Sequence, residues 1–248
     1  MPRSKFGDIY NDLKTKIEQG DYPYQSLVPS ENTLAAAFGC SRKTVRRALA
    51  GLIETGYVQA IQGKGVRVLY RAADRRPAGK VPFTLGRLES FYEMAARFRT
   101  SYQTRVVHFS MTQTDAVLAQ ASGFAVGADV YHVQRVRVVD GRALIMDESY
   151  FLRSVVPTLT PEAAEQSIYA YLERELGVQI TTSKRTITVE HATAADRLYL
   201  EMDDYDCLAV VTNQAFNSDG ILFEYTVSRY HPEYFRFQDT ACRSRKPR

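Results

Sequence analysis

The chain has little of what disulfide frameworks, zinc sites and membrane spans require. Its 248 residues include no tryptophan and three cysteines, Cys40, Cys207 and Cys242. The cysteines are odd in number, lie far apart and form no CxxC pair, so neither a disulfide framework nor a zinc site is indicated. No apolar run resembles a signal peptide or is long enough to span a bilayer. We therefore expect a reduced, cytoplasmic protein with no membrane partner.

Catalytic motifs are absent as well. The sequence contains no GxSxG, HExxH, P-loop or dinucleotide fingerprint. Its four histidines show no ligand-like spacing, and each is better explained as a strand or surface residue than as a catalyst. We expect no catalytic residue, no bound metal and no cofactor, so binding is a better prediction than enzymatic turnover.

Positive charge is concentrated at the front of the chain. Residues 1–80 contain 14 Lys and Arg against 7 Asp and Glu, whereas residues 81–248 contain 18 against 21. The net charges of the two parts are therefore +7 and −3. This asymmetry predicts a first module that binds a polyanion, joined to a near-neutral module with another task.

Residues 41–50 combine a helix-start signal with an apolar stripe and a run of cations. At about 100° per residue, one face of the predicted helix collects four cations, namely Arg42, Lys43, Arg46 and Arg47. The opposite face collects the apolar residues Val45, Ala48, Leu49 and Leu52. Ser41 suits the N-cap, and a helix N-terminus offers N–H groups to a phosphate. Taken alone, the pattern fits a solvated charged face as well as a surface for a polyanion.

The neighbouring segments favour the polyanion. Apolar residues at helical spacing over residues 6–17 predict a first helix that stops at Gly20. Ser30 and Glu31 then start a second helix, which ends at Gly39. Two short helices separated by a glycine-containing turn, the second of them basic, are typical of a helix-turn-helix.

A β-hairpin is predicted directly after the basic helix. Residues 57–61 and 66–69 favour strands, and residues 62–65 favour a tight turn. Glycines on both sides of Lys64 let the backbone approach a groove closely while the ammonium group reaches into it. Behind a basic helix-turn-helix, this hairpin is a candidate DNA-binding wing.

Residues 5–69 resemble the winged helix-turn-helix of GntR-type bacterial transcription regulators. The resemblance rests on the segments 28–31, 41–49 and 63–65. It implies that Arg42, Lys43 and Arg46 meet major-groove bases and phosphates, and that the wing tip enters the minor groove. Asn32 stands where relatives often have arginine. The candidate DNA-binding residues are Asn32, Ser41, Arg42, Lys43, Thr44, Arg46, Arg47, Gly63, Lys64 and Gly65.

The rest of the chain alternates between strand and helix patterns. Low apolar content with proline and glycine predicts a linker at 71–82, between a DNA-binding domain at 1–70 and a second domain at 83–242. Strands are expected at 104–109, 130–139, 143–151, 178–190, 207–216 and 222–230, and helices at 90–98, 114–121, 167–176 and 194–202. Hairpin turns at 140–141 and 218–220 favour antiparallel neighbours, so we expect an α+β fold with an antiparallel sheet.

Arg135 and Arg137 are the strongest candidates for ligand binding in the second domain. Strand alternation points both guanidinium groups to one face, where an anion such as a phosphate would offset their charges. A solvated sheet face explains the same pattern and is preferred from the residues alone. Ser90-Phe91 and Ser167, at predicted helix starts, offer N–H groups to the same anion.

Residues from about 83 to 240 resemble the effector-sensing UTRA domain of the HutC branch of GntR regulators, which has a chorismate-lyase-like fold. The resemblance implies a sugar-phosphate site. Its phosphate contacts would come from Ser90, Phe91, Arg135, Arg137, Ser167 and Tyr169. Its sugar contacts would come from Asp147, Glu224 and Tyr230. Asp147 stands where glutamate is commoner, which shortens its reach by one methylene.

Within that branch, residues 147–151, 167–177 and 223–229 resemble those of trehalose operon repressors. This resemblance implies trehalose 6-phosphate as the effector, and the family pattern implies a homodimer on palindromic operator DNA. We therefore expect a repressor of trehalose utilisation that releases DNA when the effector binds. Three alternatives are a sensor of another sugar phosphate such as an amino-sugar 6-phosphate, an enzyme that shares the lyase fold, and an architectural nucleic-acid binder without an effector.

Overall fold

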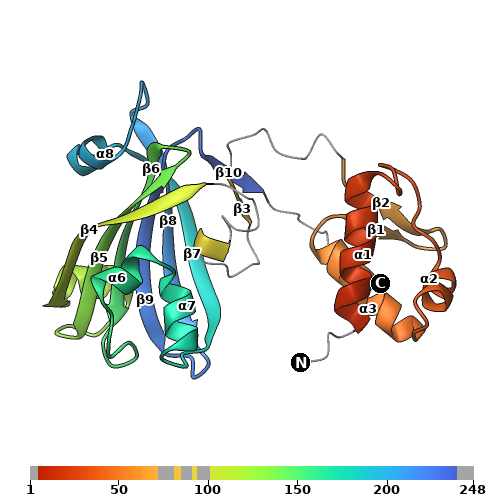
Figure 1. Cartoon of the computed structure of the whole chain (residues 1–248), viewed down its shortest axis with the longest axis horizontal. Helices are drawn as coiled ribbons and strands as arrows, with labels where there is room; N and C mark the ends of the chain where they lie inside the picture. Colours follow the sequence, from red (N-terminus) through yellow and green to blue (C-terminus); the bar gives the residue numbers. More distant parts are fainter. Residues whose placement is uncertain (1–4, 72–80, 85–90, 94–100, 239–248) are drawn as a thin grey trace, which may run out of the picture. The chain divides into compact units, whose positions relative to one another are not determined.

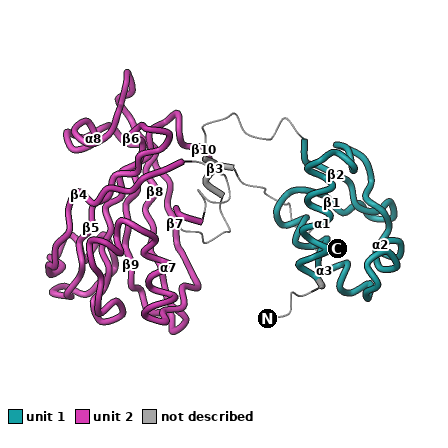
Figure 2. Tube along the Cα trace, in the orientation of Figure 1, with its two compact units in different colours: residues 1–79, 239–248 teal, residues 80–238 magenta. Residues whose placement is uncertain are grey.

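The computed structural model describes residues 5–71, 81–84, 91–93 and 101–238. The chain divides into two compact units, residues 1–79 with 239–248 and residues 80–238, which Figure 2 draws in teal and magenta. No helix in the described part of the chain is both long and apolar enough to cross a membrane.

The first unit contains three helices and a two-stranded hairpin (Figure 1). Its elements are α1 Lys5–Gln19, α2 Glu31–Ala37, α3 Arg42–Glu54, β1 Val58–Ile61 and β2 Gly65–Val68, with the two strands antiparallel. Apolar faces of all three helices meet the hairpin in one buried core, which includes Leu13, Leu34, Val45, Leu52 and Val68. The predicted winged helix-turn-helix is confirmed.

Two serines fix where the second and third helices begin. Ser30 Oγ accepts a hydrogen bond from the Thr33 N–H at 3.1 Å, and Ser41 Oγ accepts one from the Thr44 N–H at 3.2 Å. An N-cap of this kind stabilises a helix by about 1 kcal/mol. Because Ser41 sets the first turn of α3, it also sets which of the residues that follow point away from the core.

A six-stranded antiparallel sheet forms the second unit, in the order β4-β5-β6-β9-β8-β7. Its strands are β4 Tyr102–Gln113, β5 Asp129–Val139, β6 Arg142–Leu152, β7 Ile180–His191, β8 Cys207–Asn217 and β9 Leu222–Tyr230. The predicted antiparallel sheet is confirmed. Asp140 and Gly141, between β5 and β6, have φ angles of 50° and 85°, the left-handed pair that a tight hairpin turn requires.

Helices cover both faces of this sheet. The helices α6 Pro161–Glu165 and α7 Ile168–Arg174 pack on one face, hereafter the α7 face, against an apolar cluster that includes Val133 and Phe151 (Figure 1). The helices α5 Ala116–Ser122 and α8 Ala194–Tyr199 lie next to apolar clusters of the opposite face. Because side chains alternate along each strand, the odd-numbered residues of β5, and those of β6 from Ile145 to Phe151, point to the α7 face; a bulge near Ala143 breaks the alternation at the start of β6.

The sequence patterns do not predict every element. The strand β3 Val81–Thr84 pairs in parallel with β10 Phe235–Gln238, and β3 begins within the range expected as a linker. A four-residue strand whose partner lies at the far end of the chain gives no local signal. The short helix α6 was also not predicted. Of the helix expected at 90–98, the structure describes residues 91–93, which are helical.

Candidate functional site

The outward face of α3 carries four of the basic residues of the first unit. The side chains of Arg42, Lys43, Arg46 and Arg47 are exposed, as is Thr44 in part, while the apolar residues of α3 are buried. The Ser41 and Thr44 hydroxyl oxygens lie 2.9 Å apart at the N-terminus of α3. The four cations, which recur at helical spacing in the sequence, therefore form one exposed cationic surface along α3.

Arg46 is held by a carboxylate from the preceding helix. Its Nε and Nη2 donate to the two carboxylate oxygens of Glu31 at 3.2 and 2.9 Å, which joins α3 to α2. The hydrogen bond from Arg46 lowers the pKa of Glu31. With 69% of its side chain exposed, Arg46 gains little stability from this pair. The pair instead orients a guanidinium group whose outer edge is open to solvent.

The other candidate DNA-binding residues lie around this surface and on the hairpin. Asn32 is exposed on α2, and the Arg47 guanidinium lies 4.7 Å from the centre of the Phe6 ring. At the hairpin tip, Gly63 and Gly65 have φ angles of 74° and 104°, which residues with a side chain rarely adopt. The Lys64 N–H between them donates to the Ile61 carbonyl at 3.0 Å, so the Lys64 side chain projects from a closed turn.

Buried charged side chains cross three neighbouring strands on the α7 face. Arg135 and Arg137 on β5 are 6% and 5% exposed, and the two carboxylates nearby, Asp147 on β6 and Glu224 on β9, are 6% and 4% exposed. In the strand register, Asp147 lies opposite Arg135 on one side and Ser228 on the other. The solvated sheet face that the residues alone favour is therefore wrong, because both arginines are buried.

Asp147 occupies the centre of this cluster. Its Oδ2 accepts a hydrogen bond from Arg137 Nε at 2.9 Å and lies 3.8 Å from Arg135 Nη2, while its Oδ1 accepts one from the Ser228 hydroxyl at 2.7 Å. Burial opposes ionisation of Asp147, but the charges of Arg137 and Arg135 outweigh burial and lower its pKa. Asp147 is therefore ionised, and both of its oxygens already have partners.

Arg135 is less well satisfied than Arg137. Its Nη2 lies 3.5 Å from the Ser149 hydroxyl, and its Nε has no hydrogen-bond partner among the residues that the structure describes. Burial and the charge of Arg137 lower the pKa of Arg135 to about 10, so the group remains protonated at neutral pH. A buried, charged N–H without a partner is costly, and an anion would satisfy it.

Glu224 faces the cluster from β9. The Tyr169 hydroxyl donates to Glu224 Oε2 at 2.6 Å, and the Thr226 hydroxyl donates to Oε1 at 2.7 Å. Burial raises the pKa of Glu224 and also that of the Tyr169 phenol. The cluster thus contains two guanidinium groups, but its surroundings favour ionisation of only one of the two carboxyl groups, Asp147. The cluster can therefore accept further negative charge.

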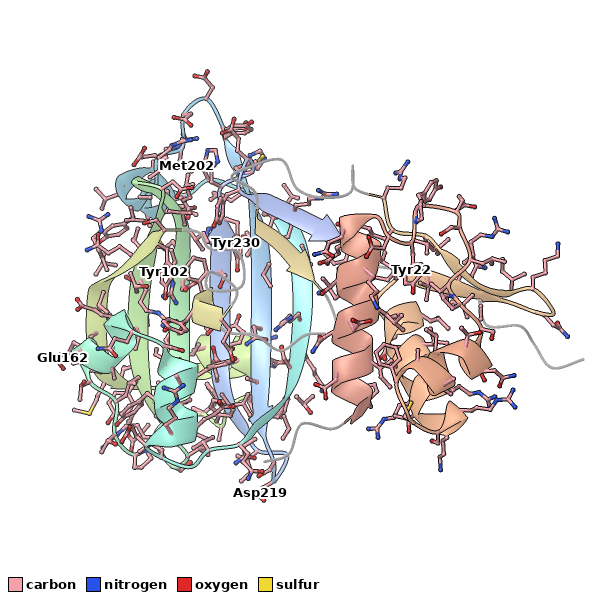
Figure 3. All side chains as sticks on the ribbon, turned by 45° about the vertical axis from the view of Figure 1, so that its right-hand side comes forward. Tyr22, Tyr102, Glu162, Met202, Asp219 and Tyr230 are labelled. Atoms are coloured by element: carbon pink, nitrogen blue, oxygen red, sulfur yellow. The ribbon has the colours of Figure 1, made fainter. Side chains whose placement is uncertain are left out.

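The remaining effector-site candidates lie at the edges of this cluster. Ser167 is the N-cap of α7, and with Tyr169 it lines a cleft of about 130 Å³. The Phe91 ring centre lies 5.0 Å from the Arg137 guanidinium. Tyr230, labelled in Figure 3, ends β9, and burial raises the pKa of its phenol. Ser90 lies outside the described residues.

Sequence reasoning missed the hydroxyl groups that complete the cluster. They are Thr104, Ser149, Thr226 and Ser228. The Thr104 hydroxyl accepts a hydrogen bond from Arg137 Nη1, and the Thr226 and Ser149 hydroxyls lie 2.9 Å apart. Strand alternation would have identified three of them, because they are two or four residues from Asp147 or Glu224 on the same strand.

A second polar group lies on the opposite face of the sheet. His132 Nε2 lies 2.9 Å from Glu148 Oε1, to which the Tyr150 hydroxyl also donates at 2.9 Å. These hydrogen bonds, the one with His132 first, lower the pKa of Glu148 to about 2. His108, His132 and His191 lie on strands as expected, whereas His231, directly after β9, is fully buried and fits neither the strand nor the surface expectation.

Comparison with known families identifies both units. Residues 6–68 match the bacterial regulatory proteins of the gntR family, and residues 99–236 match the UTRA domain. The chain is 38% identical over 245 residues to the HTH-type transcriptional regulator TreR of Bacillus subtilis (strain 168), which covers 99% of this chain and 100% of TreR. It is 25% identical over 232 residues to the mannosyl-D-glycerate transport/metabolism system repressor MngR of Escherichia coli (strain K12), covering 94% and 93% of the two chains.

Solved structures show the same folds. The crystal structure of the possible transcriptional regulator YydK from Bacillus subtilis matches 96% of this chain and 100% of its own, with a TM-score of 0.78 at 22% identity. This match shows that the two chains share a fold. The effector binding domain of the B. subtilis trehalose repressor (TreR) matches 58% of this chain and 99% of its own, with a TM-score of 0.53 at 38% identity. These relatives are regulators and not enzymes. The chain belongs to the GntR family of bacterial transcriptional regulators, with a GntR helix-turn-helix domain followed by a UTRA effector domain.

Proposed function

We propose that this protein is a homodimeric repressor of trehalose utilisation genes that is released from a palindromic operator by trehalose 6-phosphate. The main support for a phosphate ligand is Arg135, which is buried beside a second guanidinium group, that of Arg137. The Nε of Arg135 has no hydrogen-bond partner among the described residues. The support for trehalose is the 38% identity with TreR, whose effector binding domain is that of a trehalose repressor.

In this proposal α3 and the hairpin contact DNA. Arg42, Lys43 and Arg46 meet base edges and phosphates in the major groove, and Lys64 enters the minor groove. Because Arg46 already binds Glu31 through two nitrogens, DNA uses the exposed edge of its guanidinium group or displaces the carboxylate. The remaining candidates, Asn32, Ser41, Thr44, Arg47, Gly63 and Gly65, contact or shape the same surface.

In the UTRA domain the phosphate binds where the positive charge is. Arg135 and Arg137 bind it together with Ser90, Phe91, Ser167 and Tyr169, and the sugar contacts Asp147, Glu224 and Tyr230. Since both oxygens of Asp147 already have partners, a sugar hydroxyl competes there with Ser228 or Arg137. Glu224 likewise exchanges the Tyr169 or Thr226 hydroxyl for a sugar hydroxyl.

Release of DNA follows from linkage. If trehalose 6-phosphate binds one dimer conformation more tightly than another, it shifts the equilibrium towards that conformation. The size of the shift is set by the ratio of the two affinities. Repression is relieved when the favoured conformation spaces the two DNA-binding domains wrongly for the operator half-sites. A ligand with equal affinity for both conformations has no effect.

The test is fluorescence anisotropy of a labelled palindromic operator with the purified protein at fixed salt. Trehalose 6-phosphate, trehalose, glucose 6-phosphate and an amino-sugar 6-phosphate are titrated separately. We expect release by trehalose 6-phosphate alone. Release by an amino-sugar 6-phosphate but not by trehalose 6-phosphate would identify a sensor of another sugar phosphate and refute the effector proposed here.

Arg135→Met tests the phosphate assignment. Methionine fills a similar volume without burying a charge, and Asp147 keeps its hydrogen bonds from Arg137 and Ser228, so no buried charge is left without a partner. We expect the variant to fold and to bind operator like the wild type, but not to be released by trehalose 6-phosphate. Lys184→Met, on an exposed position of β7, is the matched control and should respond normally. Release of both variants at the same ligand concentration would contradict the assignment.

A further inference from the structure

The polar surface of the α7 face continues beyond Glu224 onto the last two strands of the sheet. In register, Ser149 on β6 lies opposite Thr226 on β9, Thr226 opposite Asn213 on β8, and Asn213 opposite Arg185 on β7. Neighbouring strands are about 4.8 Å apart, so this row spans roughly 14 Å across four strands. Arg185 and Asn213 therefore lie at the β7 end of a row that starts beside Arg135.

Three side chains form this end of the row, hereafter the β7–β8 group, namely Ser183, Arg185 and Asn213. The Ser183 hydroxyl donates to the Asn213 side-chain oxygen. All three side chains are half-buried, whereas the intervening Lys184 and the following Thr186 are exposed on the other face of β7. Alternation thus directs a serine, an arginine and an asparagine to the face where the buried arginine cluster lies.

Tyr169 connects the β7–β8 group to the proposed effector site. Its phenol donates to Glu224 on one side, while the Arg185 guanidinium and Asn213 act on the same phenol and oppose the rise in its pKa that burial causes. The cleft beside Tyr169 is also lined by Ile180, the first residue of β7. Tyr169 therefore contacts both the cleft at the start of β7 and Glu224 of the cluster.

We propose that Ser183, Arg185 and Asn213 form a second sugar subsite, which binds the ring remote from the phosphate in a disaccharide phosphate. Asparagine and serine both donate and accept hydrogen bonds, and arginine supplies several donors, which suits the dense hydroxyl groups of a hexose. The group is separated from Arg135 by two strands, so one ring can occupy the space near Glu224 while the second reaches β7. This inference rests on the proposed function.

The experiment is isothermal titration calorimetry of the full chain with trehalose 6-phosphate and with glucose 6-phosphate. For the wild type, we expect trehalose 6-phosphate to bind more tightly than glucose 6-phosphate, which has no second ring. We expect Arg185→Ala to weaken the binding of trehalose 6-phosphate about tenfold, because the ligand loses hydrogen bonds from a charged donor. Binding of glucose 6-phosphate should stay within about twofold of the wild type. Lys184→Ala, one residue away on the opposite face, is the matched control.

Each outcome distinguishes the subsite from the phosphate site. If Arg185→Ala weakened the binding of both ligands equally, Arg185 would contact the shared glucose 6-phosphate part, and the second subsite would be overturned. Unchanged binding of both ligands would overturn it as well. Arg185→Gln, which keeps the length and an amide donor, covers the case in which alanine disturbs folding, and it should show the same selective loss to a smaller extent. A wild type that binds neither ligand would refute the proposed function and the subsite with it.

Discussion

Replacing Asp147 by asparagine should destabilise the UTRA domain far more than the same replacement at an exposed ion pair. Asp147→Asn keeps the shape but removes the negative charge between Arg135 and Arg137, which are 6% and 5% exposed. Breaking a buried ion pair by removing one partner costs about 3–5 kcal/mol, because the other charge stays buried. In a domain of this size, 1 kcal/mol shifts Tm by about 2–4 °C, so we expect Tm to fall by about 10 °C.

Asp203→Asn is the control. Asp203 also pairs with an arginine, Arg142, but its side chain is 53% exposed, so the loss should be below about 1 kcal/mol. Thermal unfolding of the full chain by circular dichroism at neutral pH compares the two variants. The same change in Tm for both would refute the argument that burial makes the Asp147 charge important.

The pH dependence of this variant supplies a second check. The pKa of Asp147 is lowered in the folded protein, so its contribution is fully present above the ordinary carboxyl value of 3.8 and is lost as the pH falls through the lowered pKa. The difference in unfolding free energy between the wild type and Asp147→Asn should therefore shrink in acid. A difference that stays constant as the pH falls well below 3.8, while the protein is still folded, would count against ionised Asp147.

Four further predictions concern other parts of the molecule. Arg46→Ala should weaken operator binding about tenfold in the anisotropy assay, while the affinity for trehalose 6-phosphate measured by calorimetry stays normal. A parallel loss of ligand binding would contradict the separation of the two sites. Lys64→Ala should weaken operator and unrelated DNA alike and reduce the slope of log K against log salt by about 1, whereas loss confined to the operator would assign Lys64 to a base. Glu148→Gln should lower stability at neutral pH, with the loss disappearing as pH falls from the ordinary carboxyl value of 4.5 towards about 2; a loss independent of pH in chemical denaturation would point to packing instead. Glu224→Gln should raise stability at neutral pH, because the raised pKa of Glu224 means that burying its charge costs stability above that pKa. A lower urea midpoint would contradict this.

The sequence predicts the first unit well because its signals are local. A cap at Ser41 and an apolar stripe at helical spacing determine both where α3 begins and which of its faces is buried. The same reasoning locates the exposed cations without any knowledge of tertiary contacts. It gives no indication that Glu31 binds Arg46, since that pair depends on the angle between two helices.

The second unit is predicted only in part because its decisive contacts are long-range. Alternation places Arg135 and Arg137 on one face, but whether that face is solvated or buried depends on segments far away in the sequence, such as Phe91 beside Arg137 and Tyr169 near Arg135. The hydrogen-bond partners of the two arginines come from β4 and β6, and only the strand register identifies them. Local sequence patterns do not encode that register.

The parallel pairing of β3 with β10 has a consequence for the order in which the molecule is made. Val81 lies opposite Phe235, so these partners are 154 residues apart along the chain, and the second unit is incomplete until Phe235 has been synthesised. The described contacts that build the first unit fall within residues 5–71, where loop closure is inexpensive and folding is fast. During synthesis, the DNA-binding domain should therefore be folded before the domain that regulates it.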